Sequence, residues 1–122
     1  MKVLLSIKPE FAFKIFDGTK KYEFRKSIFK RKDIESVVVY ASYPVQRVIG
    51  EFKIKNILNA DLETIWQKTS DYAGISKPYY DEYFADKDTA FAIQVGRRNR
   101  YKNPKHLSDF NVAFPPQSFM YV

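Results

Sequence analysis

The sequence predicts a small α+β fold in which about six short strands and three short helices share one core. Six segments either alternate apolar with polar residues or form short apolar runs, and turn-forming residues separate them. Strands and helices do not alternate regularly, as they would in a parallel βαβ sheet. The chain has 122 residues, of which 17% are aromatic, so its rings can fill the core of a single domain over 1–122.

The first predicted elements are a strand, a helix and a second strand. Residues 2–7 form an apolar run typical of a buried strand, and residues 9–17 carry apolar side chains at helical spacing. Pro9 suits the first turn of this helix, and Gly18 suits the position just after its end. Residues 20–26 alternate, which predicts a half-buried strand with one charged face.

A basic loop and two further strands follow. Residues 27–34 predict an exposed basic loop, and residues 36–41 and 47–58 predict strands. The Tyr43-Pro44 step marks the turn between these strands. Gly50 predicts a bulge or a point of close approach inside the second of them.

The second half of the chain carries the other two helices and the last strands. Apolar spacing predicts a helix from Leu62, capped by Asn59 or Asp61, and another that begins at Ser76. The remaining expectations are a strand at 89–95, a basic extended segment at 97–103, a turn or one helical turn at 104–110 and a closing strand at 117–122.

Composition excludes several classes of protein. The chain has no Cys, which excludes disulfide scaffolds, thiolate metal sites and cysteine nucleophiles. A single histidine, His106, excludes histidine metal cages, and we expect neither a metal nor a cofactor. No apolar run is long enough to span a membrane. The N-terminus predicts a first strand and not a signal peptide, so the expected location is cytoplasmic.

Positive charge is concentrated toward both ends of the sequence. Residues 1–32 hold ten Lys and Arg against three acidic residues, and residues 97–122 hold five against one. Residues 33–96 hold six basic and ten acidic residues and offset part of this charge. If the two ends meet in space, the arrangement suits a polyanionic partner such as RNA.

The segment from Gly18 to Arg25 combines the side chains best suited to a site. Period-2 geometry places Glu23 and Arg25 on one face of the strand, and Lys20 lies at the turn, where it can bend toward them. A carboxylate beside two cations holds the Arg fork in place. The oriented Arg and Lys can then bind a phosphate or the edge of a base.

Gly18-x-Lys20-x-x-Glu23-x-Arg25 resembles the G-x-K-x-x-E-x-R signature of the ASCH domain family, relatives of the PUA-like RNA-binding barrels. Further stretches are similar to the family in the same order, namely 4–9, 40–44, 49–52 and 116–119. The resemblance implies a six-stranded PUA-like β-barrel with two or three short helices. It also implies a cleft between helix and barrel that the signature Lys, Glu and Arg line.

Three kinds of function are considered, and the resemblance implies the first two. Many members are proposed to bind RNA or to assist transcription and translation, and this is the function we expect. Some small members are similar to amidohydrolases that act on N4-acetylcytidine through a Lys, a Thr and a Glu. Lys20 matches that Lys, but Glu23 stands at the Thr position and Asp71 is the nearest carboxylate to the Glu position. A regulatory module that binds a protein or a small anion is the third alternative.

The predicted site therefore centres on Lys20, Glu23 and Arg25, which bind RNA or a modified nucleoside without a metal. If the chain is an enzyme, Lys20 and Glu23 are the working pair. Basic segments 26–32 and 97–105, the latter with Arg97 and Arg98, are expected to flank the cleft and hold the phosphate backbone. Secondary candidates by matched position or by stacking ability are Ser6, Lys8, Tyr40, Ser42, Gln117 and Ser118.

Overall fold

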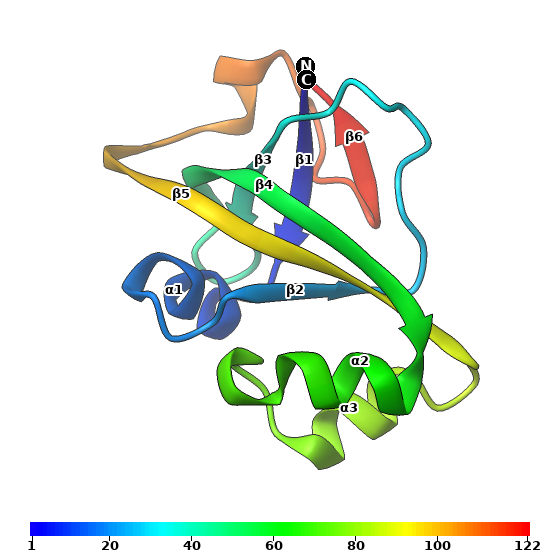
Figure 1. The fold of residues 1–122 in the computed structure, drawn as a ribbon. Coiled ribbons are helices and arrows are strands. Elements are labelled where there is room, and N and C mark those ends of the chain that lie inside the picture. The colour runs from blue at the N-terminus through cyan, green and yellow to red at the C-terminus, as the bar shows by residue number, and fades with distance from the viewer.

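A computed structural model describes all residues from 1 to 122 and shows one six-stranded sheet curled into a half-barrel (Figure 1). Its strand order is β2-β5-β4-β3-β1-β6. The strands are β1 (Lys2–Ile7), β2 (Tyr22–Arg25), β3 (Ser36–Ala41), β4 (Arg47–Asp61), β5 (Thr89–Lys105) and β6 (Phe119–Tyr121). The helices are α1 (Pro9–Asp17), α2 (Leu62–Thr69) and α3 (Lys77–Tyr83), with 3₁₀ turns at Ser70–Tyr72 and Leu107–Phe110. The predicted α+β class and strand number are confirmed.

Strands β1 and β3 form the one parallel pair of the sheet, and their ends meet beside α1. Val3 pairs with Val37 and Ile7 with Ala41, so the carboxyl ends of both strands lie together. Alternate side chains of both strands, with Ala12 and Ile15 of α1, form the main core cluster. Helix α1 therefore packs on one face of the sheet, and its first residue follows directly from β1.

Helix α1 has the boundaries that its sequence predicts. Pro9 occupies the first turn, and Gly18 ends the helix with φ = 90°, a left-handed conformation that glycine adopts without steric cost. The chain then enters β2, which pairs with the first part of β5. Glu23 and Arg25 thus lie on an edge strand, and Lys20 lies in the short connection between this strand and the end of α1.

Helices α2 and α3 form a separate layer below the sheet in Figure 1. Asp61 accepts a hydrogen bond from the Thr64 N–H and caps α2, and Ser76 caps α3 in the same way through Tyr79. Aromatic rings from α3 pack against β2, with Phe24 lying edge-on to Tyr80 and Phe84. The two helices consequently bury the apolar face of β2.

Strands β4 and β5 are longer than their sequence pattern predicts. They pair from Asp61 and Thr89 to Val48 and Lys105, and the register shifts at three places along the ladder. Each shift interrupts the alternation from which strand length is judged, so the basic segment 97–103 looks like a separate element in the sequence. None of the helices has the length and apolar character needed to span a bilayer.

Candidate functional site

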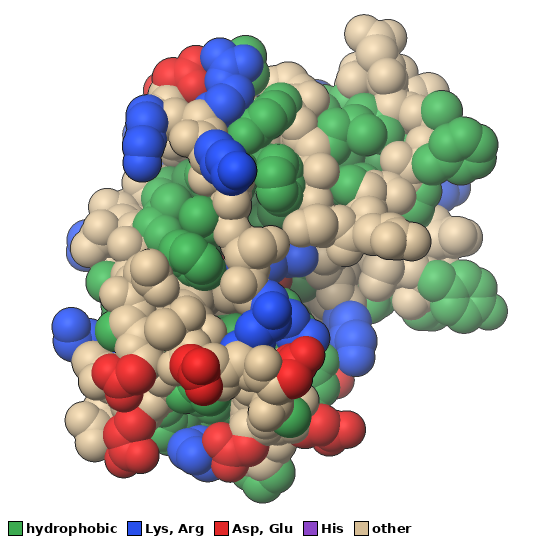
Figure 2. Space-filling model, turned by 90° about the vertical axis from the view of Figure 1, so that its right-hand side faces the viewer, with side chains coloured by type: hydrophobic (Ala, Val, Ile, Leu, Met, Phe, Trp, Pro, Cys, Tyr) green, Lys and Arg blue, Asp and Glu red, His purple; other side chains and the backbone are tan.

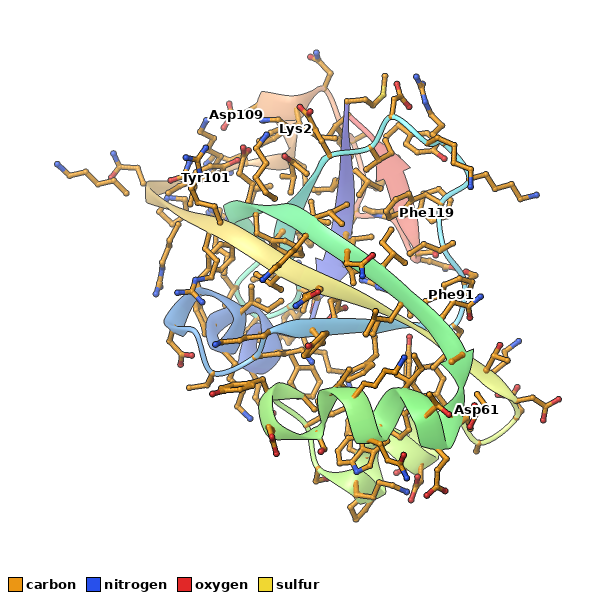
Figure 3. All side chains as sticks on the ribbon, viewed as in Figure 1. Lys2, Asp61, Phe91, Tyr101, Asp109 and Phe119 are labelled. Carbon is orange, nitrogen blue, oxygen red and sulfur yellow. The ribbon has the colours of Figure 1, made fainter.

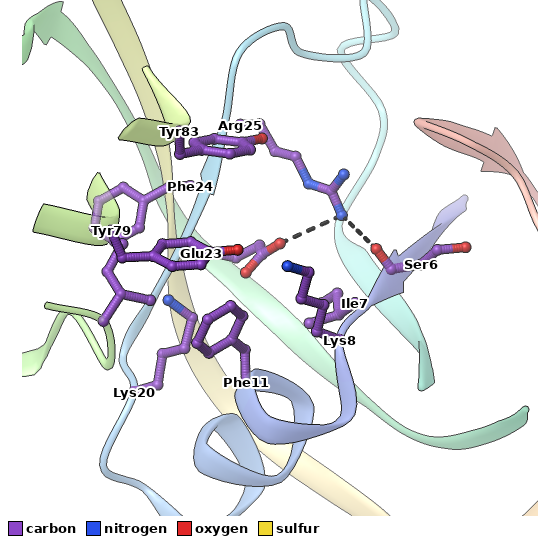
Figure 4. A pocket seen from close by; sticks show the side chains of 11 residues that line it. Ser6, Ile7, Lys8, Phe11, Lys20, Glu23, Phe24, Arg25, Tyr79 and Tyr83 are labelled. Atoms are coloured by element: carbon purple, nitrogen blue, oxygen red, sulfur yellow. Dashed lines mark hydrogen bonds and ion pairs between the residues drawn. The ribbon is translucent and has the colours of Figure 1, made fainter. Parts of the chain in front are cut away.

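A pocket of about 160 Å³ opens where the end of β1, the start of α1, strand β2 and helix α3 meet (Figure 4). Polar and charged side chains line one part of it, and aromatic rings line the rest. The lining residues are Ser6, Ile7, Lys8, Phe11, Lys20, Glu23, Phe24, Arg25, Ile75, Tyr79 and Tyr83. Five of the predicted site residues are therefore brought together, namely Ser6, Lys8, Lys20, Glu23 and Arg25.

Arg25 is held between two oxygens at one side of the pocket. Its Nη2 lies 3.3 Å from Glu23 Oε2 and donates a hydrogen bond of 3.1 Å to the backbone carbonyl of Ser6 (Figure 4). The Nε of Arg25 is buried and has no hydrogen-bond partner. The Glu23 carboxylate and the Ser6 carbonyl therefore orient the guanidinium at this side of the pocket.

The charged face that the alternation predicts for β2 is itself buried. Glu23 and Arg25 side chains retain only 10% and 13% of their exposure. Phe24 packs against Tyr80 and Phe84 on the apolar side of the strand. The end of β1 and the rings of Phe11, Tyr79 and Tyr83 surround the charged side. A buried ion pair of this kind is weak evidence for stability, and its position in a pocket favours a role in binding.

Lys20 is the most deeply buried charged side chain of the pocket. Its Nζ donates a 2.6 Å hydrogen bond to the Ala73 carbonyl and lies 4.8 Å above the Phe24 ring. Burial lowers the pKa of Lys20 to about 8, Glu23 opposes this shift, and the nearby Lys14 adds to it. Near neutral pH, part of the Lys20 population is therefore an uncharged amine that can accept a proton.

The loop between the 3₁₀ turn at Ser70–Tyr72 and α3 fixes Lys20 from above. Gly74 has φ = 70°, and a Cβ built on it would lie 2.5 Å from Lys20 Cβ and Cγ. Only glycine fits both this conformation and this contact. Sequence reasoning missed Ala73 and Gly74 because their partner lies fifty residues away in the chain; the one available signal was an isolated glycine between two helical segments.

Aromatic rings form the walls of the pocket. Phe11 and Tyr79 meet edge-on with ring centroids 5.1 Å apart, and the Lys8 Nζ lies 5.3 Å from the Tyr79 centroid. At the opposite rim, Lys26 Nζ lies 4.8 Å above Tyr83, whose pKa is raised by burial. Rings of this kind offer flat surfaces for a planar ligand. Tyr79 and Tyr83 stand at helical spacing in α3, a pattern that does not distinguish the rim of a pocket from the core.

Three of the secondary candidates lie beside the pocket without lining it. Ser42 follows β3 and donates its backbone N–H to the Ile7 carbonyl. Gln117 and Ser118 are exposed and follow Pro116, whose carbonyl accepts a hydrogen bond of 2.8 Å from Ser6 Oγ. These residues border the elements that form the pocket, and they contribute no lining atoms to it.

Tyr40 was expected to be available for stacking, and the structure corrects this. Its side chain is buried in a cluster with Leu4, Val38 and Val48, on the face of the sheet that residues 107–112 cover. The period of 2 along β3 places Tyr40 opposite to the neighbours that face α1. A base could not reach its ring from the pocket.

Arg97 and Arg98 are exposed on β5, apart from the pocket. The guanidinium of Arg98 lies against Gly18, where a built Cβ would be 3.1 Å from Nη1, and Arg100 lies 5.2 Å from the Phe13 ring. Phe11 and Phe13 are two residues apart in α1 and so point to different sides of the helix. The arginines of β5 thus lie next to the other side of α1.

The arrangement can hold a small planar ligand by stacking and can contact its edge with both donors and an acceptor. Lys8, Lys20 and Arg25 supply donors, and the Glu23 carboxylate supplies acceptor oxygens. No group of three or more His, Asp or Glu side chains that could hold a metal comes together in the structure.

Comparison with known proteins places this geometry in a family. Residues 5–97 match the sequence profile of the ASCH domain. The chain belongs to the ASCH domain family. The signature from Gly18 to Arg25 lies within the matched region, and its Lys, Glu and Arg line the pocket.

Relatives of this ASCH domain include enzymes and parts of longer proteins. An ASCH domain-containing ribonuclease of Zymomonas mobilis is 32% identical over 124 residues, which cover 99% of this chain and 84% of that protein. The crystal structure of ASCH from Zymomonas mobilis has a TM-score of 0.90 at 29% identity and covers 99% of this chain and 87% of that one. This likeness confirms the predicted PUA-like fold.

A longer relative shows the same domain in another setting. The large ribosomal subunit protein uL22 of Ureaplasma parvum is 32% identical to this chain over 120 residues. The match covers 98% of this chain and 39% of that protein, so the ASCH domain spans about two fifths of the relative's length.

Proposed function

We propose that this ASCH domain binds single-stranded RNA and takes one unpaired base, or a free modified nucleoside, into the pocket around Lys20, Glu23 and Arg25. The observation that carries the proposal is the pocket itself, in which aromatic walls meet a buried set of two cations and a carboxylate. RNA-binding proteins commonly stack splayed bases on aromatic rings and contact their edges with polar side chains.

The size of the pocket supports a single ring as the ligand. A cavity of about 150 Å³ is large enough to bind benzene, and this pocket has a volume of about 160 Å³. RNA as the polymer is supported by the Zymomonas mobilis relative that is named a ribonuclease. Stacking contributes about 1–3 kcal/mol per base, and the buried polar groups supply selectivity among bases.

Titration of the four ribonucleosides and of N4-acetylcytidine, followed by NMR shifts of the pocket resonances, tests the proposal. One nucleoside should bind with preference and shift the signals of Phe11 and Tyr79. Glu23→Gln should weaken this binding at least about tenfold, because one buried hydrogen bond to a charged group contributes roughly 1.5–3 kcal/mol. Glu63→Gln, on the exposed surface of α2, is the matched control. If no nucleoside moves these signals, the pocket is not a base site.

A hydrolytic activity is the second candidate, and the position of Lys20 favours it. An amine with a pKa of about 8 next to a carboxylate can serve as a general base near neutral pH. Two substrates separate the possibilities, namely N4-acetylcytidine, followed by release of cytidine, and single-stranded RNA, followed by strand cleavage. Turnover of either substrate that Lys20→Met abolishes would make the pocket an active site, whereas binding without turnover leaves it a recognition site.

A further inference from the structure

Resting on the proposed function, we infer that an RNA strand leaves the pocket on one side only, past Arg25 and Lys26 and along the loop of residues 26–32. The lysines of this loop, Lys26, Lys30 and Lys32, would bind successive phosphates. The arginines of β5 and the layer of α2 and α3 lie off this path. The inference replaces the expectation that basic segments on both sides of the cleft hold the strand.

The loop is joined directly to the pocket and is held in place. It continues from Arg25, and Lys26 lies over the ring of Tyr83 at the rim. Phe29 is buried in the main core and meets Phe119 edge-on, while the backbone N–H of Arg31 donates to the Tyr121 hydroxyl. A phosphate-binding segment that is already ordered loses less entropy when the strand binds.

The cations of the loop are available for phosphates. Lys30 and Lys32 are exposed, and neither forms an ion pair, whereas Arg31 is engaged with Asp33 at 2.7 Å. Lys26 contacts a ring and no carboxylate. Three lysines without carboxylate partners therefore follow the rim of the pocket in sequence.

The other exits from the pocket disfavour phosphates. Beyond Phe11 and Tyr79 lies a second hollow that carries the carboxylates of Glu10 and Asp71, and its one cation, Lys14, already pairs with Glu10 at 3.7 Å. Residues 62–88, which include α2 and α3, contain six acidic residues and three lysines. Figure 2 shows acidic side chains gathered on this lower part of the face and basic side chains at its centre and top.

The basic half of β5 lies too far along the sheet to share the path. Arg25 pairs with Phe91, and Arg97 lies six residues further along β5, which is roughly 20 Å at about 3.3 Å per residue. Figure 3 shows Phe91 and Tyr101 at opposite ends of this strand. A strand that passes Arg25 toward the loop thus moves away from Arg97 and Arg98.

Binding of a short labelled single-stranded RNA across about 50 to 200 mM salt tests this path. Lys30→Ala with Lys32→Ala should reduce the steepness of log affinity against log salt by about 1.4, since each phosphate contact on a single strand contributes about 0.7. Binding of the free nucleoside should stay unchanged. Lys68→Ala with Lys87→Ala removes the same charge from the helical layer and should leave the slope nearly unchanged, as should Arg97→Ala with Arg98→Ala.

Each other outcome has a distinct meaning. Loss of slope in the Arg97 and Arg98 variant but not in the loop variant would overturn the path, because the strand would then leave on the other side of α1. Equal losses of the salt slope in the loop and helical-layer variants would also overturn the path, since RNA affinity would then depend only on net charge. RNA binding that depends on Lys30 and Lys32 without any nucleoside binding would keep the path and reject the base pocket. Absence of RNA binding by the unaltered chain would reject both.

Discussion

Gly74 lies directly against the aliphatic part of Lys20, so closely that a Cβ at Gly74 would come within 2.5 Å of two Lys20 carbons. In the same loop, the Ala73 carbonyl accepts a 2.6 Å hydrogen bond from the Lys20 amine. The loop before α3 therefore both covers Lys20 and fixes the direction of its amine. A substitution in this loop should alter the pocket although it replaces none of the signature residues.

Gly74→Ala should lower the free energy of unfolding by about 2–4 kcal/mol. The substitution combines an unfavourable positive φ with a steric clash between the new Cβ and the buried Lys20 side chain. Urea denaturation measures this loss. Gly18→Ala is the matched control, since Gly18 has φ = 90° but faces the mobile end of Arg98. The control should cost about 1 kcal/mol, the cost of the backbone conformation alone. Equal losses in the two variants would contradict the contact between Gly74 and Lys20.

The pKa of Lys20, lowered by burial to about 8, predicts a stability that rises with pH. Between this value and the ordinary lysine value the unfolded chain binds more protons than the folded one, so unfolding becomes less favourable as pH increases. Below pH 8 the cost of burying the charged amine is fully present. From about pH 7.5 to about pH 9.5, the native chain should gain roughly 2 kcal/mol relative to Lys20→Met. Parallel pH dependences of the two proteins in urea denaturation would show that Lys20 titrates as in water.

Arg25→Ala should weaken binding of the preferred nucleoside while leaving the salt dependence of RNA binding largely intact. Arg25 contacts Glu23 and the Ser6 carbonyl and lines the pocket, so its loss should remove a base contact and not a backbone contact. A nucleoside titration and a salt series on the same variant separate the two effects. A slope that falls by as much as in the loop variant would mean that Arg25 binds phosphate.

Tyr40→Ala should destabilise the fold without a specific effect on binding. Its ring is buried on the face of the sheet opposite to α1, and removal of a large buried aromatic side chain costs about 3–5 kcal/mol. Tyr40→Phe should retain both stability and nucleoside affinity, because it keeps the buried ring and removes only the hydroxyl. Reduced nucleoside affinity in Tyr40→Phe, measured on protein that circular dichroism shows to be fully folded, would mean that Tyr40 takes part in binding.

The fold and the centre of the site followed from local patterns in the sequence. Pro9 and Gly18 marked the ends of α1 correctly, and the spacing of Lys20, Glu23 and Arg25 placed all three in one pocket. Burial of these charges could not be predicted, because an alternating strand gives no sign of what covers its polar face. Phe11, Gly74 and Tyr79 were missed as pocket residues for the same reason, since they reach the site only through the packing of α1 and α3.

Side chains of the same chemical type occupy different environments, which depend on the element and the face on which each side chain lies. Tyr40 and Tyr79 both belong to elements with apolar neighbours, yet one faces the covered side of the sheet and the other lines the pocket. The two clusters of basic residues, 26–32 and 97–105, were visible in the sequence, but the distance between the clusters in space was not. It depends on the antiparallel pairing of β2 with the first residues of β5, which directs the two clusters to opposite ends of the strand.

Strands β1 and β6 lie next to each other, and the backbone N–H of Val122 donates to the Lys2 carbonyl at 3.0 Å. Ile7, at the pocket end of β1, is five residues from Lys2, or roughly 17 Å at about 3.3 Å per residue. A polypeptide fused to either terminus would therefore emerge from the same corner of the molecule, away from the pocket. Tethering this unit to a larger assembly, or inserting it into a surface loop of a host protein, would leave the opening of the pocket turned toward solvent.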